Sequence, residues 1–366
     1  MNNTLPVVNA HNGWSRLEEV WLGDVYPCSW YDHLAPEVRD TFYALTEKTQ
    51  EDLAVIQRRL EEFGVKVRRP VYDNIDNYLD PTGQLTKPEI SPRDSFAAIG
   101  NTFFMPHPQL SPRLPKTIRP WQHIIDEYAS QGIEINKKSH ARWFTISGAN
   151  IVRAGRDLYI DTHYTFFERG ASQSLEQEEF EKNYARHFSG QRVHFLNNGG
   201  HIDGCFAVLK PGLILCNEYF SEYDKTFPGW KLIRRFSPEF FQHPNIKYRP
   251  GTSPRENRKW WLPDLEFPKA FNKHVIQHAI DWVGDYTETY FEVNCLSIDE
   301  KNVMVLGENE PLFRELEQQG ITAHPVPFRC RTFWDGGLHC ITLDIRRQSK
   351  LEDYFPERDS QSLIFY

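Results

Sequence analysis

One pattern recurs along this chain and restricts the folds that it can adopt: an apolar run, a tight turn and a second apolar run. Each of its four occurrences predicts a β-hairpin. The occurrences lie at residues 95–105, 149–160, 205–216 and 293–306. A fifth hairpin would form if Leu17–Gly23, near one end of the chain, paired with Ile341–Ile345, near the other. That pairing would close the hairpins into a ring.

A second pattern accompanies the hairpins: an amphipathic helix, a glycine and a short strand. The helix that contains Leu53 ends at Gly64, and a strand is predicted at residues 65–68. The same order occurs around Gly132 and Gly320. Modules of hairpin, helix and strand at irregular spacing are typical of repeat architectures in which neighbours bury one another. We therefore predict one α/β domain in the form of a closed propeller.

Composition excludes several classes of protein. The chain has 366 residues, 40% of them hydrophobic and 25% charged, as expected of a globular protein. Its net charge of -8 argues against nucleic acid as a partner, because such binders carry a basic excess. No stretch approaches the ~20 apolar residues of a membrane span, so no membrane partner is expected. The 6 cysteines include no C-x-x-C pair, and we expect a reduced, cytoplasmic protein without a metal or other cofactor.

Polar residues that could carry chemistry stand just before the apolar runs. Cys340 precedes the ring-closing strand, His201 and Asp203 precede the third hairpin, and Asp94 and Ser147 precede the first and second. In a ring of equivalent modules these positions surround one axis, so the side chains could converge. A cysteine becomes nucleophilic beside a histidine that accepts its proton, and carboxylates bind planar cations. The pattern indicates covalent Cys/His chemistry on a guanidinium or amidinium group.

Each of these residues also has a plain structural interpretation. A cysteine beside an apolar strand is most often a buried core thiol. Arg153 and Asp157 flank a hairpin turn, where a surface ion pair is the simpler explanation. His339 and Cys340 are neighbours, and on a strand they would point to opposite faces, which disfavours joint binding of a metal ion.

Five segments resemble the amidinotransferases of the pentein superfamily. They are residues 14–23, 92–94 with 100–101, 153–157, 201–203 with 210–212, and 336–347. The resemblance implies the pentein fold, a five-module α/β propeller of pseudo-fivefold ββαβ repeats, in a single domain over residues 1–366. It is weak over residues 221–288, which we interpret as an insertion or lid. The related enzymes are often dimers, so a homodimer is a further expectation.

The resemblance also implies a reaction, the transfer of an amidino group from an arginine-like donor to an amine acceptor. Cys340 would attack the guanidinium carbon and leave a covalent amidino-cysteine. His201 would protonate the departing amine and then accept a proton from the incoming one. Asp94 and Asp203 would hold the guanidinium. The further candidates for substrate binding are Asn150, Glu292 and Arg153.

Three positions depart from the pattern of the family. Ser147 stands where the family has the aspartate that orients the catalytic histidine, and Tyr219 or Phe220 stands where an arginine grips the donor carboxylate. Met105 replaces a glutamate. Ser147 is thus the candidate third catalytic residue, but the group that orients His201 stays open. The candidates are Ser147, Asn150, Glu288, Glu292 and Asp335.

Two alternatives to transfer remain at this stage. The first is a guanidine hydrolase of the same superfamily, which would use the same Cys, His and Asp residues with water as the acceptor. The second is a pentein that has no activity and serves as a binding module. The joint presence of Cys340, His201, Asp203 and Asp94 argues against the second.

Overall fold

The computed structural model of the protein describes most of the chain. The described residues are 7–106, 114–136, 147–161, 188, 190–196, 201–216, 223–234, 262, 268–283, 293–358 and 363–365. Within them the strands form five sheets, whose orders are β15-β1-β2, β3-β4-β5, β6-β7-β8, β9-β10-β11 and β12-β13-β14. One further strand, β16, pairs with the edge of the third sheet.

The strands are short and follow the predicted apolar runs closely. Their bounds are β1 Leu17–Leu22, β2 Lys66–Arg68, β3 Ala97–Ile99, β4 Thr102–Phe104, β5 Glu134–Asn136, β6 Ile151–Ala154, β7 Asp157–Asp161, β8 Arg192–Leu196, β9 Phe206–Lys210, β10 Leu213–Cys216, β11 Lys231–Arg234, β12 Leu296–Asp299, β13 Asn302–Leu306, β14 Thr322–Val326, β15 Thr342–Arg347 and β16 Leu363–Phe365.

The helices connect these strands. The α-helices are α1 Pro36–Glu62, α2 Pro92–Ser95, α3 Leu114–Ile118, α4 Gln122–Ser130, α7 Tyr223–Thr226, α10 Lys269–His278, α11 Glu310–Gln318 and α12 Arg331–Trp334. The 3-10 helices are η1 Cys28–Tyr31, η2 Ile75–Tyr78, η3 Arg119–Trp121, η4 Gly148–Asn150, η5 Ile202–Gly204 and η6 Ile280–Trp282. None of the helices in the described ranges is long and apolar enough to cross a bilayer.

All five predicted hairpins are present, including the one that joins the two ends of the chain. β1 pairs antiparallel with β15, in a register that places Val20 opposite Asp344. In every sheet the middle strand then pairs parallel with a third strand. The same local topology therefore occurs five times.

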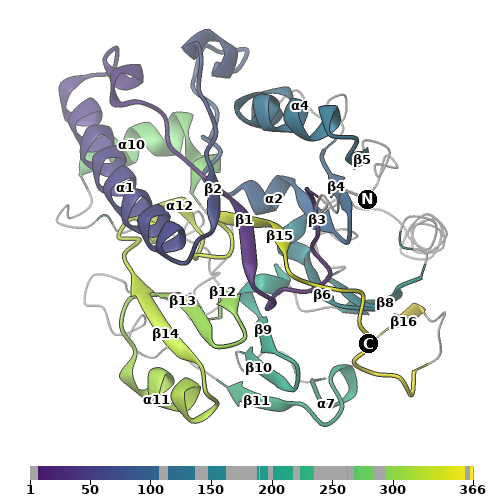
Figure 1. Ribbon diagram of the computed structural model, residues 1–366. Helices are drawn as coiled ribbons and strands as arrows, with labels where there is room; N and C mark the ends of the chain where they lie inside the picture. Colours follow the sequence, from purple (N-terminus) through teal and green to yellow (C-terminus); the bar gives the residue numbers. More distant parts are fainter. Residues whose placement is uncertain are drawn as a thin grey trace.

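The predicted sequence of helix, glycine and strand is confirmed at three places. Helices α1, α4 and α11 end before Gly64, Gly132 and Gly320, and these glycines have φ values of 78°, 77° and 72°. This left-handed conformation is the usual end of a helix and favours glycine. In Figure 1 the three helices lie on the outside of the molecule, around the strands.

Buried apolar side chains fill the spaces between the sheets. Among the described residues they form five clusters: four contain residues of two sheets that follow one another along the chain, and the fifth contains residues of the last sheet and the first. The cluster between the last sheet and the first includes Val20 and Leu22 of β1 together with Leu296 and Met304 of β12 and β13. Packing thus joins the fifth sheet to the first, as the hairpin of β1 and β15 requires.

Parts of residues 221–288 contribute to the repeated architecture, and the interpretation of this segment as an insertion or lid stays a prediction. β11 is the third strand of the fourth sheet, paired in parallel with β10. Val275 of α10 and Trp282 of η6 belong to the cluster between the last sheet and the first. The sequence resemblance is weak here even though these parts complete the repeated architecture. Residues 235–261 lie outside the described ranges.

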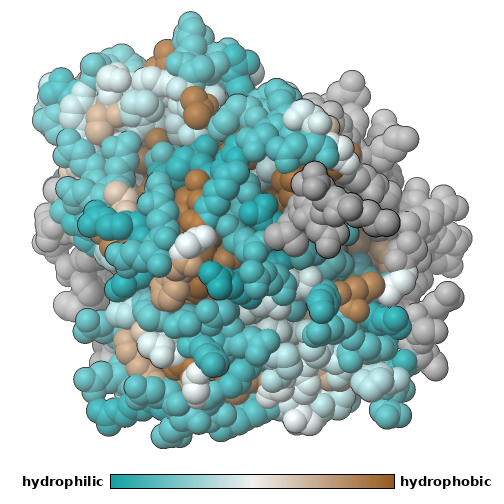
Figure 2. Space-filling model, in the orientation of Figure 1, coloured by the Kyte–Doolittle hydropathy of each residue, from teal (hydrophilic) through white to brown (hydrophobic). Residues whose placement is uncertain are grey.

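The face of the molecule seen in Figure 2 is mainly hydrophilic, with small and scattered apolar areas. Among the described residues the large apolar side chains that are exposed are Val55, Val71 and Leu351. Single exposed apolar side chains of this kind are ordinary on a globular protein.

Candidate active site

The candidate nucleophile Cys340 lies in a turn between α12 and β15. Its side chain is buried, with 1% of its surface exposed. The turn begins at Asp335, whose φ of 51° is in the left-handed region, and passes through Gly336 and Gly337. A Cβ on Gly337 would lie 2.6 Å from the side chain of Asn294, so only glycine allows this close approach.

One carboxylate oxygen binds both the thiol and its neighbouring imidazole. The Cys340 thiol donates to Asp203 Oδ2 over 3.4 Å, and His339 Nδ1 lies 2.9 Å from the same oxygen. Asp203 belongs to η5, just before β9, so the fourth sheet presents this carboxylate to the turn before β15. Within the described residues its second oxygen, Oδ1, is buried without a hydrogen-bond partner.

The prediction that His339 and Cys340 point to opposite faces is wrong. Both side chains reach Asp203, because residues 338–341 form a turn and β15 begins only at Thr342. The amide of Ile341 donates to Gly337 O over 3.2 Å, which confirms the turn. The alternation of strand side chains therefore does not apply at this position.

Electrostatics set the charge state of this pair. Burial and the positive charge of Arg93 lower the pKa of His339 to about 4, although the hydrogen bond with Asp203 opposes this shift. Burial alone would raise the pKa of Asp203, but the contact with His339 and the charges of His201 and Arg93 lower it overall. At neutral pH the site therefore holds an ionised Asp203 that accepts a hydrogen bond from a neutral imidazole.

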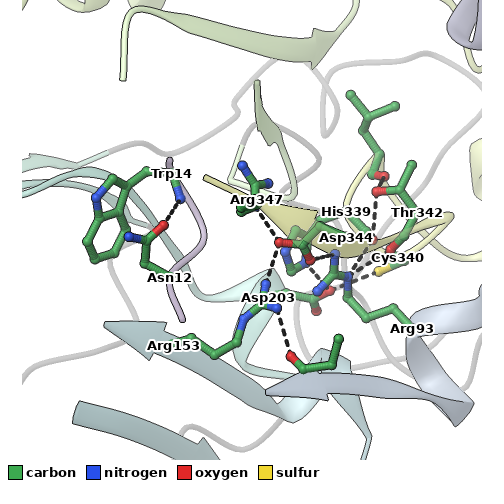
Figure 3. A network of polar contacts seen from close by, with 12 residues as sticks. Asn12, Trp14, Arg93, Arg153, Asp203, His339, Cys340, Thr342, Asp344 and Arg347 are labelled. Atoms are coloured by element: carbon green, nitrogen blue, oxygen red, sulfur yellow. Dashed lines mark hydrogen bonds and ion pairs between the residues drawn. The ribbon is translucent and has the colours of Figure 1, made fainter. Parts of the chain in front are cut away.

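A buried ionic cluster fixes the backbone on the other side of Cys340 (Figure 3). Arg93 Nε donates to the carbonyl oxygens of His339 and Thr342, each over 2.8 Å. The same guanidinium forms an ion pair with Asp344, which also pairs with Arg153 and Arg347 at distances of 2.8, 2.5 and 2.5 Å in that order. All four side chains are buried.

The charged groups of the ionic cluster shift one another's pKa values. The three guanidinium groups hold the pKa of Asp344 well below its usual range, although burial opposes this. Burial lowers the pKa of Arg153 to about 10, with Asp344 opposing the shift and the other two arginines adding to it. Asp344 is thus the anion in the cluster that keeps three buried cations stable.

Cys340 and Asp203 are the predicted residues that the structure brings into contact. His201 lies immediately before η5, and its carbonyl oxygen accepts from the Cys205 thiol at 3.5 Å. Its imidazole is close enough for its charge to lower the pKa of Asp203. Direct action of His201 on Cys340 stays a prediction.

Asp94 and Asn150, from the starts of the first two hairpins, belong to elements that pack beside the site. Asp94 lies in α2, which packs against η4 and β15. Burial, together with the charge of Asp94, raises the pKa of Glu89 to about 8, which places a second carboxyl group near Asp94. The side chain of Asn150 is buried in η4, and its Oδ1 has no hydrogen-bond partner among the described residues.

Ser147 has a structural role in the structure. Its Oγ accepts a hydrogen bond from the amide of Ala149 and donates to Arg93 O, both over 3.3 Å. It therefore caps η4 in the usual manner of a serine. A part for Ser147 in catalysis stays a prediction.

The surface ion pair predicted between Arg153 and Asp157 is wrong. Arg153 is buried and binds Asp344 and the carbonyl oxygen of Ala98, the latter over 2.8 Å. Asp157 is also buried, and Arg192 is one of its partners, at 2.7 Å. The two residues share one hairpin, but Arg153 binds groups of the first and second sheets, whereas Asp157 binds Arg192 of β8 within its own sheet. The guanidinium of Arg153 is thereby committed to Asp344, which does not favour the predicted contact with substrate.

Other positions singled out from the sequence are Met105, Glu288, Glu292, Tyr219 and Phe220. Met105 is buried in the cluster between the first two sheets. Glu288, Glu292, Tyr219 and Phe220 lie outside the described residues.

Sequence reasoning missed three residues of this site: His339, Arg93 and Asn294. Asn294 lies at the start of the fourth predicted hairpin and comes two residues before β12, as Asp203 comes three residues before β9. The rule that selected polar residues before the apolar runs would therefore have found Asn294. The roles of His339 and Arg93 depend on a turn and on contacts between distant modules, which no local pattern reveals.

The chain is similar in sequence and in fold to one class of enzymes, the amidinotransferases. No family model matches the chain. It is 24% identical to inosamine-phosphate amidinotransferase 1 of Streptomyces glaucescens, across 96% of this chain and 99% of that protein. It is 25% identical to the L-arginine:L-lysine amidinotransferase of Pseudomonas savastanoi pv. phaseolicola, across 57% of this chain and 46% of that protein. The expected resemblance to amidinotransferases, which are transferases, is confirmed.

Solved structures extend this similarity to the fold. SxtG, an amidinotransferase from Microseira wollei, superposes with a TM-score of 0.65 at 22% identity, over 95% of this chain and 99% of that one. DDAH from Pseudomonas aeruginosa superposes with a TM-score of 0.52 at 13% identity, over 90% of this chain and 99% of that one. The chain therefore shares its fold with amidinotransferases and, more distantly, with a hydrolase.

Proposed function

We propose that this protein is an amidinotransferase that moves an amidino group from an arginine-like donor to an amine through a covalent intermediate on Cys340. The observation that carries the proposal is the geometry of Asp203. One of its oxygens contacts the thiol, and the other is a buried acceptor with no partner in the described part of the chain. A planar guanidinium that donates to this oxygen would bring its carbon close to the sulfur. The amidinotransferase relatives support the same reaction.

The first half of the reaction forms the covalent intermediate. The Cys340 thiol gives its proton to His201, and the sulfur forms a bond with the guanidinium carbon as a C–N π bond opens onto nitrogen. The C–N bond to the donor amine then breaks, and His201 returns the proton to that amine. The products are a neutral amine and a cationic amidino group on Cys340, so protons and charge balance.

The second half repeats these steps in reverse. An acceptor amine gives a proton to His201 as its nitrogen attacks the amidino carbon. The C–S bond then breaks, the amidinated amine leaves as a cation, and His201 returns the proton to the sulfur. The neutral imidazole of His339 keeps Asp203 hydrogen-bonded and ionised throughout. Asp94 and Asn150 are the proposed further contacts for the substrate, together with Glu292.

The proposed architecture for this chemistry is the closed five-module propeller of the pentein fold. Two observations support it: the same three-strand topology occurs five times, and apolar packing joins the fifth sheet to the first. In a closed ring the five strand starts share one axis. Asp203, Asn294 and Cys340 come from three such starts and are in mutual contact.

An assay with arginine tests the proposed function. The protein is incubated with arginine, with and without a panel of amines, and ornithine, citrulline and ammonia are measured. Transfer predicts ornithine only when an amine is present, together with an amidinated amine. Citrulline and ammonia without an amine would instead show a hydrolase, and no product with any guanidine would leave only a binding module. Cys340→Ala is the control that should abolish every product without unfolding the protein.

A further inference from the structure

We propose that Asn294 is a catalytic residue that donates a hydrogen bond to the sulfur of Cys340 and stabilises its anionic form. The inference rests on the proposed function for the identity of the nucleophile. Asn294 Nδ2 lies 3.0 Å from Cys340 Sγ, and the carboxamide is almost completely buried, at 3% exposure. It therefore touches the reacting atom itself.

The orientation of the carboxamide is fixed by the groups around its other end. Asn294 Oδ1 accepts from the backbone amides of His339, over 2.8 Å, and Cys340, over 3.0 Å. A backbone amide only donates, so the oxygen must face these two groups and the NH₂ must face the sulfur. The second Nδ2 contact, with Asp203 O at 3.3 Å, is consistent with this orientation because a carbonyl oxygen only accepts.

The carboxylate of Asp203 opposes ionisation of the Cys340 thiol, and a hydrogen-bond donor to the sulfur counteracts this effect. Asp203 Oδ2 is 3.4 Å from the sulfur, and an ionised carboxylate at that distance favours the protonated thiol. An N–H donor favours the thiolate, because a hydrogen bond to the charged form of a group stabilises that form. When a cationic guanidinium neutralises Asp203, the Asn294 hydrogen bond remains on the sulfur. Asn294 thus acts directly on the nucleophile, whereas Arg93 acts on the backbone around it.

The absence of a side chain at Gly337 leaves space for the carboxamide of Asn294. A Cβ on Gly337 would approach the Cβ and Oδ1 of Asn294 to 2.6 Å, so glycine at this position lets the carboxamide reach the turn. The same carboxamide therefore sets both the conformation of the turn and the state of its thiol. A structural role alone would require only the Oδ1 contacts.

The test separates these two roles with two variants. Asn294→Asp keeps an oxygen acceptor for both backbone amides but replaces the donor with a carboxylate, and Asn294→Leu removes both functions at similar volume. Asn12→Asp is the matched control, because Asn12 is equally buried and its Oδ1 accepts from the amides of Trp14 and Ser15 away from the sulfur. Thermal melting identifies any variant that fails to fold.

The readout is the rate of alkylation of Cys340 across pH, followed by mass spectrometry of the peptide that contains it. Two reagents are used, neutral iodoacetamide and cationic 2-chloroacetamidine. Loss of one hydrogen bond to a charged group predicts alkylation about 10- to 100-fold slower at pH 7.5 in both Asn294 variants, with a pH profile displaced toward higher pH. Asn12→Asp should react as the wild type does.

The outcomes distinguish this inference from the proposed function. If folded Asn294→Asp reacts at the wild-type rate and with the wild-type pH profile, the inference is wrong whatever the reagent. If the wild type shows no preference for the cationic reagent, the result contradicts the proposed guanidinium site. The effect of the Asn294 substitutions on the rate of alkylation by iodoacetamide still decides the role of that residue. Should Asn294→Leu not fold, Asn294→Asp alone carries the decision.

Discussion

Replacing Asp344 by asparagine tests the ionic cluster that supports the nucleophile turn. The substitution keeps the shape of the side chain but removes the anion that compensates three buried arginines. Breaking a buried ion pair by removing one partner costs about 3–5 kcal/mol. With an unfolding entropy of about 2.1 cal/mol/K per residue, a chain of 366 residues would melt about 4 to 7 °C lower. Thermal unfolding at neutral pH measures this directly.

The control for this experiment is an ion pair at the surface. Arg314 and Glu310 are 2.7 Å apart on α11 and are both well exposed. Exposed pairs of this kind contribute about 0.3–0.5 kcal/mol, so Glu310→Gln should change the melting temperature by less than about 1 °C. If Asp344→Asn also melted within 1 °C of the wild type, the argument that Asp344 stabilises this interior would be wrong.

Two further predictions concern the residues around the thiol. The pKa of His339 is about 4 in the folded protein and about 6.5 in an unfolded chain, so the unfolded chain binds more protons between these pH values. The wild type should therefore lose more unfolding free energy between pH 7 and pH 5 than His339→Asn does, and equal losses in denaturant titrations would contradict the pKa assignment. Gly337→Ala must displace Asn294, which predicts a loss of about 1–3 kcal/mol and slower alkylation of Cys340. Gly13→Ala, where a Cβ meets nothing within 4 Å, should change neither, and identical behaviour of the two variants would refute the packing argument.

The repeated hairpins could be predicted because their signal is local. An apolar run, a turn and a second apolar run are contiguous in sequence, and each became a pair of antiparallel strands. The pairing of β1 with β15 was predictable only from the expectation of a ring, since its strands lie at opposite ends of the chain. The third strand of the fourth sheet, β11, was missed because residues 221–288 resemble the family weakly.

The partners of charged side chains could not be predicted in the same way. Arg153 and Asp157 are close in sequence, but their ion pairs are with Asp344 and Arg192 from other strands. His339 was expected to point away from Cys340, but a short turn interrupts the alternation of a strand before β15. Which groups meet at the centre of a ring depends on how the modules pack, and the sequence pattern within one module does not contain that information.

The most direct test of the central claim is the mass of Cys340 after brief exposure of the protein to arginine without an acceptor amine. The account predicts an amidino group on this residue, found on the peptide that contains it, and release of ornithine in equal amount. Addition of an acceptor amine should then remove the group. An unmodified Cys340, in a protein that nevertheless converts arginine, would contradict covalent transfer through this thiol.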